Sequence, residues 1–143
     1  MQSTGVGVSD EVVNQFNDFK LKRAPYNNRY YIYKINDAGT TIEIESAGDI
    51  SKSYDDFMGA LPPNEPRYGV VDLEFVTDDG RPTSKLVFMS WVPDTSRVKA
   101  KMLYAGSKDA LKKSLVGVGI HLSATDSSEL ALDYVLASVK RFA

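Results

Sequence analysis

The 143-residue chain has no cysteine, one histidine and one tryptophan. Without cysteine it has no disulfide framework, no cysteine-ligated zinc and no cysteine nucleophile. No apolar run approaches the roughly 18 residues of a membrane-spanning helix, and residues 1–5 lack the charged and apolar regions of a secretory signal. These absences favour an intracellular protein, in which 143 residues are enough to bury one hydrophobic core.

Net charge is small as well, because 17 Lys and Arg residues against 19 Asp and Glu residues give −2. A near-neutral total excludes a generally basic nucleic-acid-binding protein. The charge is unevenly distributed, however, since residues 97–113 carry six cations and a single acid, Asp109. That segment has a local charge of +5, so the rest of the chain carries −7.

Residues 96–116 have the pattern of one long helix, on which these cations would form a stripe. At about 100° per residue, Lys101, Lys108 and Lys112 fall within roughly 20° of one line. Such a stripe can bind an acidic protein surface, phosphates or anionic lipid. It can equally be a solvated face with an ordinary Asp109–Lys113 ion pair, and the residues alone leave both interpretations open.

The pattern of apolar residues predicts an α/β protein. Helices are expected over residues 10–21, after Ser53, over 96–116 with a kink at Gly106-Ser107, and after Asp126. Strands are expected over residues 30–35, 41–45, 67–77, 86–92 and 118–122. This order predicts one domain over residues 1–143, with a mixed sheet of about five strands, helices on both faces and a flexible tail at residues 1–8.

Few residues suggest catalysis. His121 falls on the polar side of its strand and is a candidate general base, but no Ser-His-Asp or metal-ligand spacing surrounds it. Asp72 and Glu74 share a strand face, as a glycosidase pair would, yet nothing else supports hydrolysis. The glycine-containing loops match no phosphate-binding fingerprint. The residues therefore predict a binding protein without a catalytic, metal or cofactor site.

Several stretches, in this order, are those of a known family: 5–11 with 16–21, 54–57 with 61–62, 67–68 with Asp72, 91–95, and the run Val98-Lys99-Ala100-Lys101-Met102-Leu103-Tyr104-Ala105-Gly106-Ser107-Lys108-Asp109-Ala110-Leu111-Lys112-Lys113. Together they resemble the actin-depolymerising factor/cofilin family over nearly the whole chain. The resemblance implies a single ADF-homology domain that acts as a monomer in the cytoplasm, the cytoskeleton and also the nucleus. Members are not enzymes and need no cofactor.

The resemblance also implies what such a protein does. Members bind monomeric actin (G-actin), preferably with ADP bound, and filamentous actin (F-actin). They promote disassembly by severing filaments and by speeding subunit loss from pointed ends. Phosphoinositides compete with actin for binding to family members, because the same cations bind the lipid head groups.

Residues carry over to the family's monomer-binding surface, which joins the N-terminal tail to the long helix. The corresponding positions are Ser3, Thr4, Gly5, Val6, Lys99, Lys101, Met102, Lys108, Lys112 and Lys113. The cations would face acidic actin, while Met102 would fill an apolar cleft. Ser3 and Thr4 are also candidate phosphorylation sites, since many relatives are inhibited by phosphate on the residue before this glycine, where its charge repels acidic actin.

At the positions of the family's filament-side surface, this sequence has fewer charged residues than the family usually has. Its expected residues are Arg81, Thr83, Lys85 and Arg141. Thr83 stands where another basic residue is common, and Ala137 and Ser138 replace a charged pair. Loss of these cations predicts weaker stable binding to filament sides, with monomer binding retained.

Other classes of function remain to be compared. A coactosin-like ADF-homology protein would bind filaments without severing, but the intact basic run and tail argue against it. An enzyme using His121 and a phosphoinositide-dependent membrane-surface protein are two further candidates. Only an actin-binding regulator accounts for the whole order of motifs.

Overall fold

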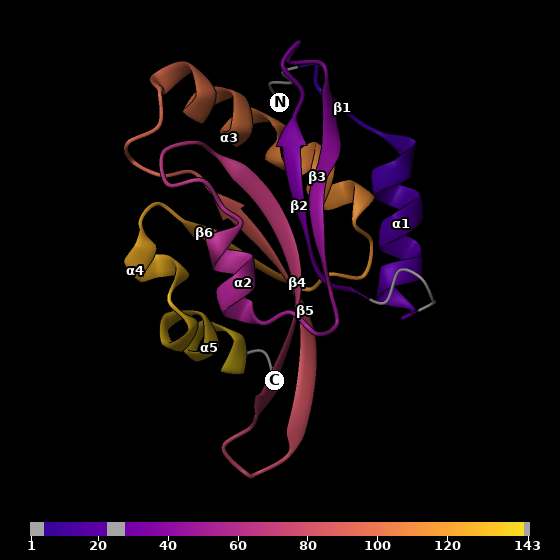
Figure 1. Cartoon of the computed structure of the whole chain (residues 1–143), viewed down its shortest axis with the longest axis vertical. Coiled ribbons are helices and arrows are strands. Elements are labelled where there is room, and N and C mark those ends of the chain that lie inside the picture. The colour runs from indigo at the N-terminus through magenta and orange to yellow at the C-terminus, as the bar shows by residue number, and fades with distance from the viewer. Residues whose placement is uncertain (1–4, 23–27, 142–143) are drawn as a thin grey trace.

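The computed structural model describes residues 5–22 and 28–141, and Figure 1 shows their arrangement. Within these residues a single sheet has the order β1-β3-β2-β4-β5-β6. Its strands are β1 (Gly7–Val8), β2 (Asn28–Ile35), β3 (Thr41–Asp49), β4 (Arg67–Val76), β5 (Pro82–Trp91) and β6 (Ile120–Ala124). The helices are α1 (Asp10–Lys20), α2 (Tyr54–Gly59), α3 (Val98–Ser114), α4 (Ser127–Leu130) and α5 (Leu132–Lys140).

The sheet is mixed, as predicted. The inner pairs β2–β3, β2–β4 and β4–β5 are antiparallel, whereas the outer pairs β1–β3 and β5–β6 are parallel. The strand that the sequence did not predict is β1, because residues 1–8 were expected to be a flexible tail. Instead, Gly7 and Val8 pair with Thr41 and Ile42, and the Gly7 N–H donates to the Thr40 carbonyl at 2.9 Å.

Helices cover both faces of the sheet, which confirms the predicted α/β architecture. On one face α2, α4 and α5 pack over a core that includes Phe57 and Val135, and on the other face α1 and α3 pack over a core that includes Phe16 and Leu111 (Figure 1). Strand β4 serves both cores, since alternate side chains point to opposite faces. This double burial explains the apolar sequence of the central strands.

Two helices begin at the caps that the sequence predicts. The Ser9 hydroxyl accepts the Val12 N–H at the start of α1, where Asp10 follows in the first turn. At α2, Ser53 and Asp56 form a reciprocal capping box. Short-range polar contacts therefore decide where these helices start.

Two helices differ in detail from what the sequence led us to expect. Helix α3 runs without a break through Gly106-Ser107, and the Ser107 side chain is buried. The expected last helix is two helices, because the backbone at Ala131 is extended (φ −55°, ψ 141°) and separates α4 from α5.

The β4–β5 hairpin extends past the rest of the sheet. Strand β2 pairs with β4 no further than Val71, and β6 pairs with β5 only from Val87 onwards. Among the described strands, residues 72–86, which we call the hairpin arm, therefore pair only with each other (Figure 1). The arm turns at residues 77–81, where Gly80 has a φ of +87° that favours glycine.

Helix α3 is attached to the sheet through Tyr104. The Ile35 N–H donates to the Tyr104 hydroxyl at 2.9 Å, and the Tyr68 hydroxyl donates to the Tyr104 carbonyl. The two tyrosine rings lie 5.0 Å apart between their centroids. Burial raises the pKa of both phenols, so they stay neutral and keep these bonds at physiological pH.

We expect the substitution Tyr104→Phe to lower the free energy of unfolding by about 1–3 kcal/mol, because it leaves the buried Ile35 N–H without an acceptor. Chemical denaturation monitored by circular dichroism would measure this loss. Tyr134→Phe is the matched control, since the Tyr134 side chain is 53% exposed. Equal stability of both variants would contradict the role assigned to the Tyr104 hydroxyl.

Candidate functional site

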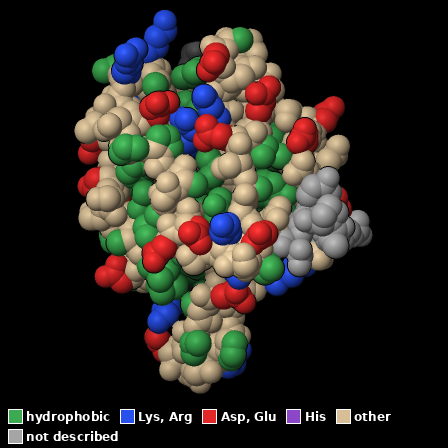
Figure 2. Space-filling view, viewed as in Figure 1, with side chains coloured by type: hydrophobic (Ala, Val, Ile, Leu, Met, Phe, Trp, Pro, Cys, Tyr) green, Lys and Arg blue, Asp and Glu red, His purple; other side chains and the backbone are tan. Residues whose placement is uncertain are grey.

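The outer face of α3 combines cations with exposed apolar side chains. Lys99 and Lys113 are exposed, Lys101, Lys108 and Lys112 are partly exposed, and Met102 is 69% exposed. Figure 2 shows Lys and Arg side chains projecting over α3 at the top of the molecule. Val98 adds a second exposed apolar side chain in the first turn.

The charges of α3 are not neutralised within the structure. Among the described residues, no carboxylate forms an ion pair with a lysine of α3 or with Arg97. The Asp109–Lys113 pair that would make this an ordinary solvated face is not formed. A row of unpaired cations around an apolar side chain suits an acidic partner with an apolar cleft.

The end of the N-terminal tail lies beside this helix. Gly5 is exposed with a φ of +76°, and β1 contacts α3. The Val6 side chain is buried in the core beneath α1 and α3, so it anchors the tail instead of facing a partner. Ser3 and Thr4 lie outside the described residues. The structure therefore brings residues 5–8 and α3 together, as the predicted monomer-binding surface requires.

His121 lies next to the same surface, although the sequence placed it only on the polar side of its strand. Its exposed ring packs edge-on against Phe88 at 5.9 Å between centroids. Partial burial, and then the charges of Lys112 and Lys108, hold the pKa of His121 below its usual value. Among the described residues no carboxylate bonds to the ring, so nothing here supports a general base.

The expected filament-side residues lie elsewhere on the molecule. Arg81 is exposed at the turn of the hairpin arm, Thr83 and Lys85 are partly exposed along β5, and Arg141 is exposed directly after α5. Figure 1 shows the arm reaching to the bottom of the view, with α5 ending beside its upper part, away from α3 at the top. Arg81 also donates to Asp79 at 3.1 Å, which partly neutralises its charge.

The remaining carboxylate pair is structural. Asp72 is buried, which raises its pKa, and it lies 3.8 Å from Lys22. Glu74 is exposed and bonds to Arg29 at 2.8 Å. Each carboxylate therefore has its own cation, unlike a glycosidase pair. Over the described ranges, no group of three potential ligands could hold a metal ion, and no helix is long and apolar enough to cross a membrane.

Comparison with known proteins gives the family. The chain matches the model for cofilin/tropomyosin-type actin-binding proteins over residues 5–140. An actin-depolymerizing factor of Lilium longiflorum is 46% identical over 135 residues, covering 94% of this chain and 95% of that protein. A cofilin of Mycosarcoma maydis is 42% identical over 139 residues, covering 97% of each. The chain is therefore a member of the cofilin/tropomyosin-type actin-binding family.

Solved structures agree with this membership. The crystal structure of a Streptomyces griseoflavus cofilin superposes with a TM-score of 0.86 at 38% identity, covering 96% of this chain and 98% of that one. The structure of human coactosin-like protein has a TM-score of 0.76 at 14% identity, covering 99% and 93%. The second likeness shows the fold alone, so it does not favour the coactosin-like alternative.

We expect Lys112→Gln to raise the pKa of His121 towards its usual value, because it removes a nearby positive charge. Since the folded pKa lies below the unfolded one, stability should fall as the pH drops through that interval, and less so in the variant. The chain has a single histidine, so one ring signal in an NMR titration reports the shift. Lys52→Gln is the control, and an equal shift there would contradict the assignment.

Proposed function

We propose that this protein binds actin monomers, preferably ADP-bound, through α3 and the adjoining N-terminal residues, and that it promotes filament disassembly by severing and by pointed-end subunit loss. Membership of an actin-binding family supports the choice of partner. The observation that carries the proposed surface is the row of unpaired cations around exposed Met102 on α3. The protein acts as a binding protein, without catalysis.

Electrostatics and packing have separate roles on this surface. The cations would raise the association rate with an acidic partner and fix its orientation, and salt would weaken both effects. Met102 would supply the apolar contact, because its flexible side chain adapts to an irregular cleft. Tyr104 holds the helix in place before binding, which lowers the entropic cost of association.

The filament-side surface is weaker by the same reasoning. The described cations there are few, and Asp79 already bonds Arg81. Thr83, Ala137 and Ser138 contribute no charge at positions where cations or charged pairs are common in the family. Stable decoration of filaments is therefore reduced, while severing needs only transient binding.

The positive charge of α3 also gives two routes by which binding would be regulated. Phosphorylation at Ser3 or Thr4 would add negative charge to the N-terminal tail and oppose the binding of an acidic partner. Phosphoinositide head groups would compete with actin for the lysines of α3. The protein would act as a monomer in the cytoplasm, with the actin cytoskeleton, and in the nucleus.

The double charge reversal Lys99→Glu with Lys101→Glu should weaken monomer binding by on the order of tenfold or more, because it places acids against an acidic partner. Titration of fluorescently labelled ADP-actin would measure the affinity. Lys52→Glu reverses an exposed charge away from α3 and should bind normally. Unchanged affinity of the α3 variant would show that the surface is wrongly assigned.

Co-sedimentation at micromolar concentration should leave most of the unmodified protein in the supernatant above actin filaments. Thr83→Lys with Ser138→Arg should increase the pelleted fraction severalfold, because it restores cations to the filament side. Ser46→Lys with Ala47→Arg adds the same charge to β3 and should have little effect. Stoichiometric pelleting of the unmodified protein would contradict reduced decoration.

A further inference from the structure

The hairpin arm needs support from outside the sheet. Within residues 5–22 and 28–141, the segment 72–86 forms a two-stranded ribbon with no third strand beside it, and such ribbons are marginally stable on their own. At the base, Glu74 bonds to Arg29 at 2.8 Å, and Phe75 packs in the same core as Val135 and Val139 of α5. These contacts leave the turn itself, residues 77–81, to be held by other means.

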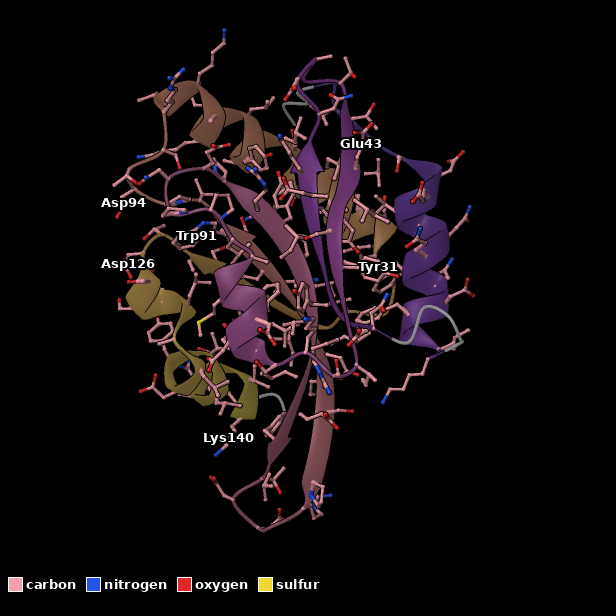
Figure 3. The ribbon with its side chains drawn as sticks, in the orientation of Figure 1. Tyr31, Glu43, Trp91, Asp94, Asp126 and Lys140 are labelled. Atoms are coloured by element: carbon pink, nitrogen blue, oxygen red, sulfur yellow. The ribbon has the colours of Figure 1, made fainter. Side chains whose placement is uncertain are left out.

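The turn is ordered internally but has little contact with the body. The Thr77 N–H donates to the Arg81 carbonyl at 2.9 Å, and the Thr77 hydroxyl donates to Asp79. Among the described residues, one hydrogen bond or ion pair joins the turn to residues outside the arm: Lys140 Nζ lies 3.4 Å from Asp78 Oδ1. Figure 3 shows Lys140 extending from α5 towards the turn.

This contact crosses a gap instead of a packed interface. A cavity of about 280 Å³ separates the turn from α5, lined by Thr77, Asp78, Asp79, Arg81 and Lys140. Val76, the last residue of β4, is 56% exposed, so apolar packing does not continue to the tip. The direction of the turn relative to α5 therefore depends on the ion pair.

That direction matters for the filament-side surface, which has residues on both sides of the gap. Arg81 and Lys85 belong to the arm, and Arg141 follows Lys140 directly at the end of α5. A rigid partner binds both groups most tightly when their separation is already fixed. A mobile arm would lose conformational entropy on binding, and this loss would weaken the affinity.

We propose that Lys140 and Asp78 are positioning residues, whose ion pair holds the hairpin arm against α5 and sets the spacing of the two halves of the filament-side surface. This inference rests on the proposed function for its partner but not for its geometry. If the ion pair has this role, the acid Asp78 favours binding to a filament whose surface is itself acidic. Simple electrostatics predicts the opposite, since Asp78 lies beside the cation Arg81.

The direction in which Asp78→Asn changes filament affinity distinguishes the two explanations. If the ion pair positions the arm, Asp78→Asn should weaken filament binding by about threefold, the scale expected for an exposed ion pair. If Asp78 acts only through its charge, the same change should strengthen binding. Affinity for monomeric ADP-actin should stay the same in either case, because α3 is untouched. Asp55→Asn removes an equally exposed acid from α2 and is the matched control.

A double-mutant cycle tests the coupling. Filament binding at low salt, measured by co-sedimentation, should be no weaker in the Asp78→Asn, Lys140→Gln double variant than in Lys140→Gln alone, because the pair is already broken. Strictly additive effects, or tighter binding of Asp78→Asn, would overturn the proposal while leaving monomer binding as a separate test of the proposed function.

A measurement without actin gives an independent test of the geometry. The chain has no cysteine, so spin labels can be attached specifically at Ser84→Cys on the arm and Ala137→Cys on α5. We expect the distance distribution between them to broaden when Asp78→Asn or Lys140→Gln is added, and to stay narrow with Asp55→Asn. An unchanged distribution in all three would overturn the proposal.

Discussion

The position of α3 depends on the two hydrogen bonds of Tyr104, and the proposed monomer-binding surface depends on α3. The hydroxyl accepts from β2 and the carbonyl accepts from Tyr68 of β4, so one residue joins the helix to two strands. A buried bond of this kind is costly to break, because the backbone N–H of Ile35 would lose its partner away from water. With its inner side held in this way, the helix can present lysines on its outer side without collapsing onto neighbouring acids.

The separation of charge follows from that arrangement. The acids of the body are held by their own partners or point elsewhere, as Glu45 and Glu65 do with Arg67, and Asp72 does with Lys22. The lysines of α3 receive no such partner within the described residues. A molecule with a net charge of −2 thus has a directed cationic face. At the proposed filament-side surface, Arg81 is paired with Asp79, whereas no ion pair of Lys85 or Arg141 is found among the described residues.

Much of the fold could be predicted from local patterns. Ser9 and Ser53 mark helix starts because their side chains bond to backbone groups within three residues. The strands of the hairpin follow from the alternation of side chains. The failures share a cause. Strand β1 depends on pairing with distant residues, and the break at Ala131 is a local backbone change, and apolar periodicity encodes neither.

The sequence by itself determined the α/β class, the long cationic helix and the family, because charge count, periodicity and motif order are properties of the chain in one dimension. It did not reveal that the lysines of α3 form no ion pair with the described acids, that His121 lies beside them, or that Lys140 meets Asp78 across 62 residues. Only the tertiary structure decided these points, since electrostatic interactions act through space and fall off with distance regardless of separation along the chain.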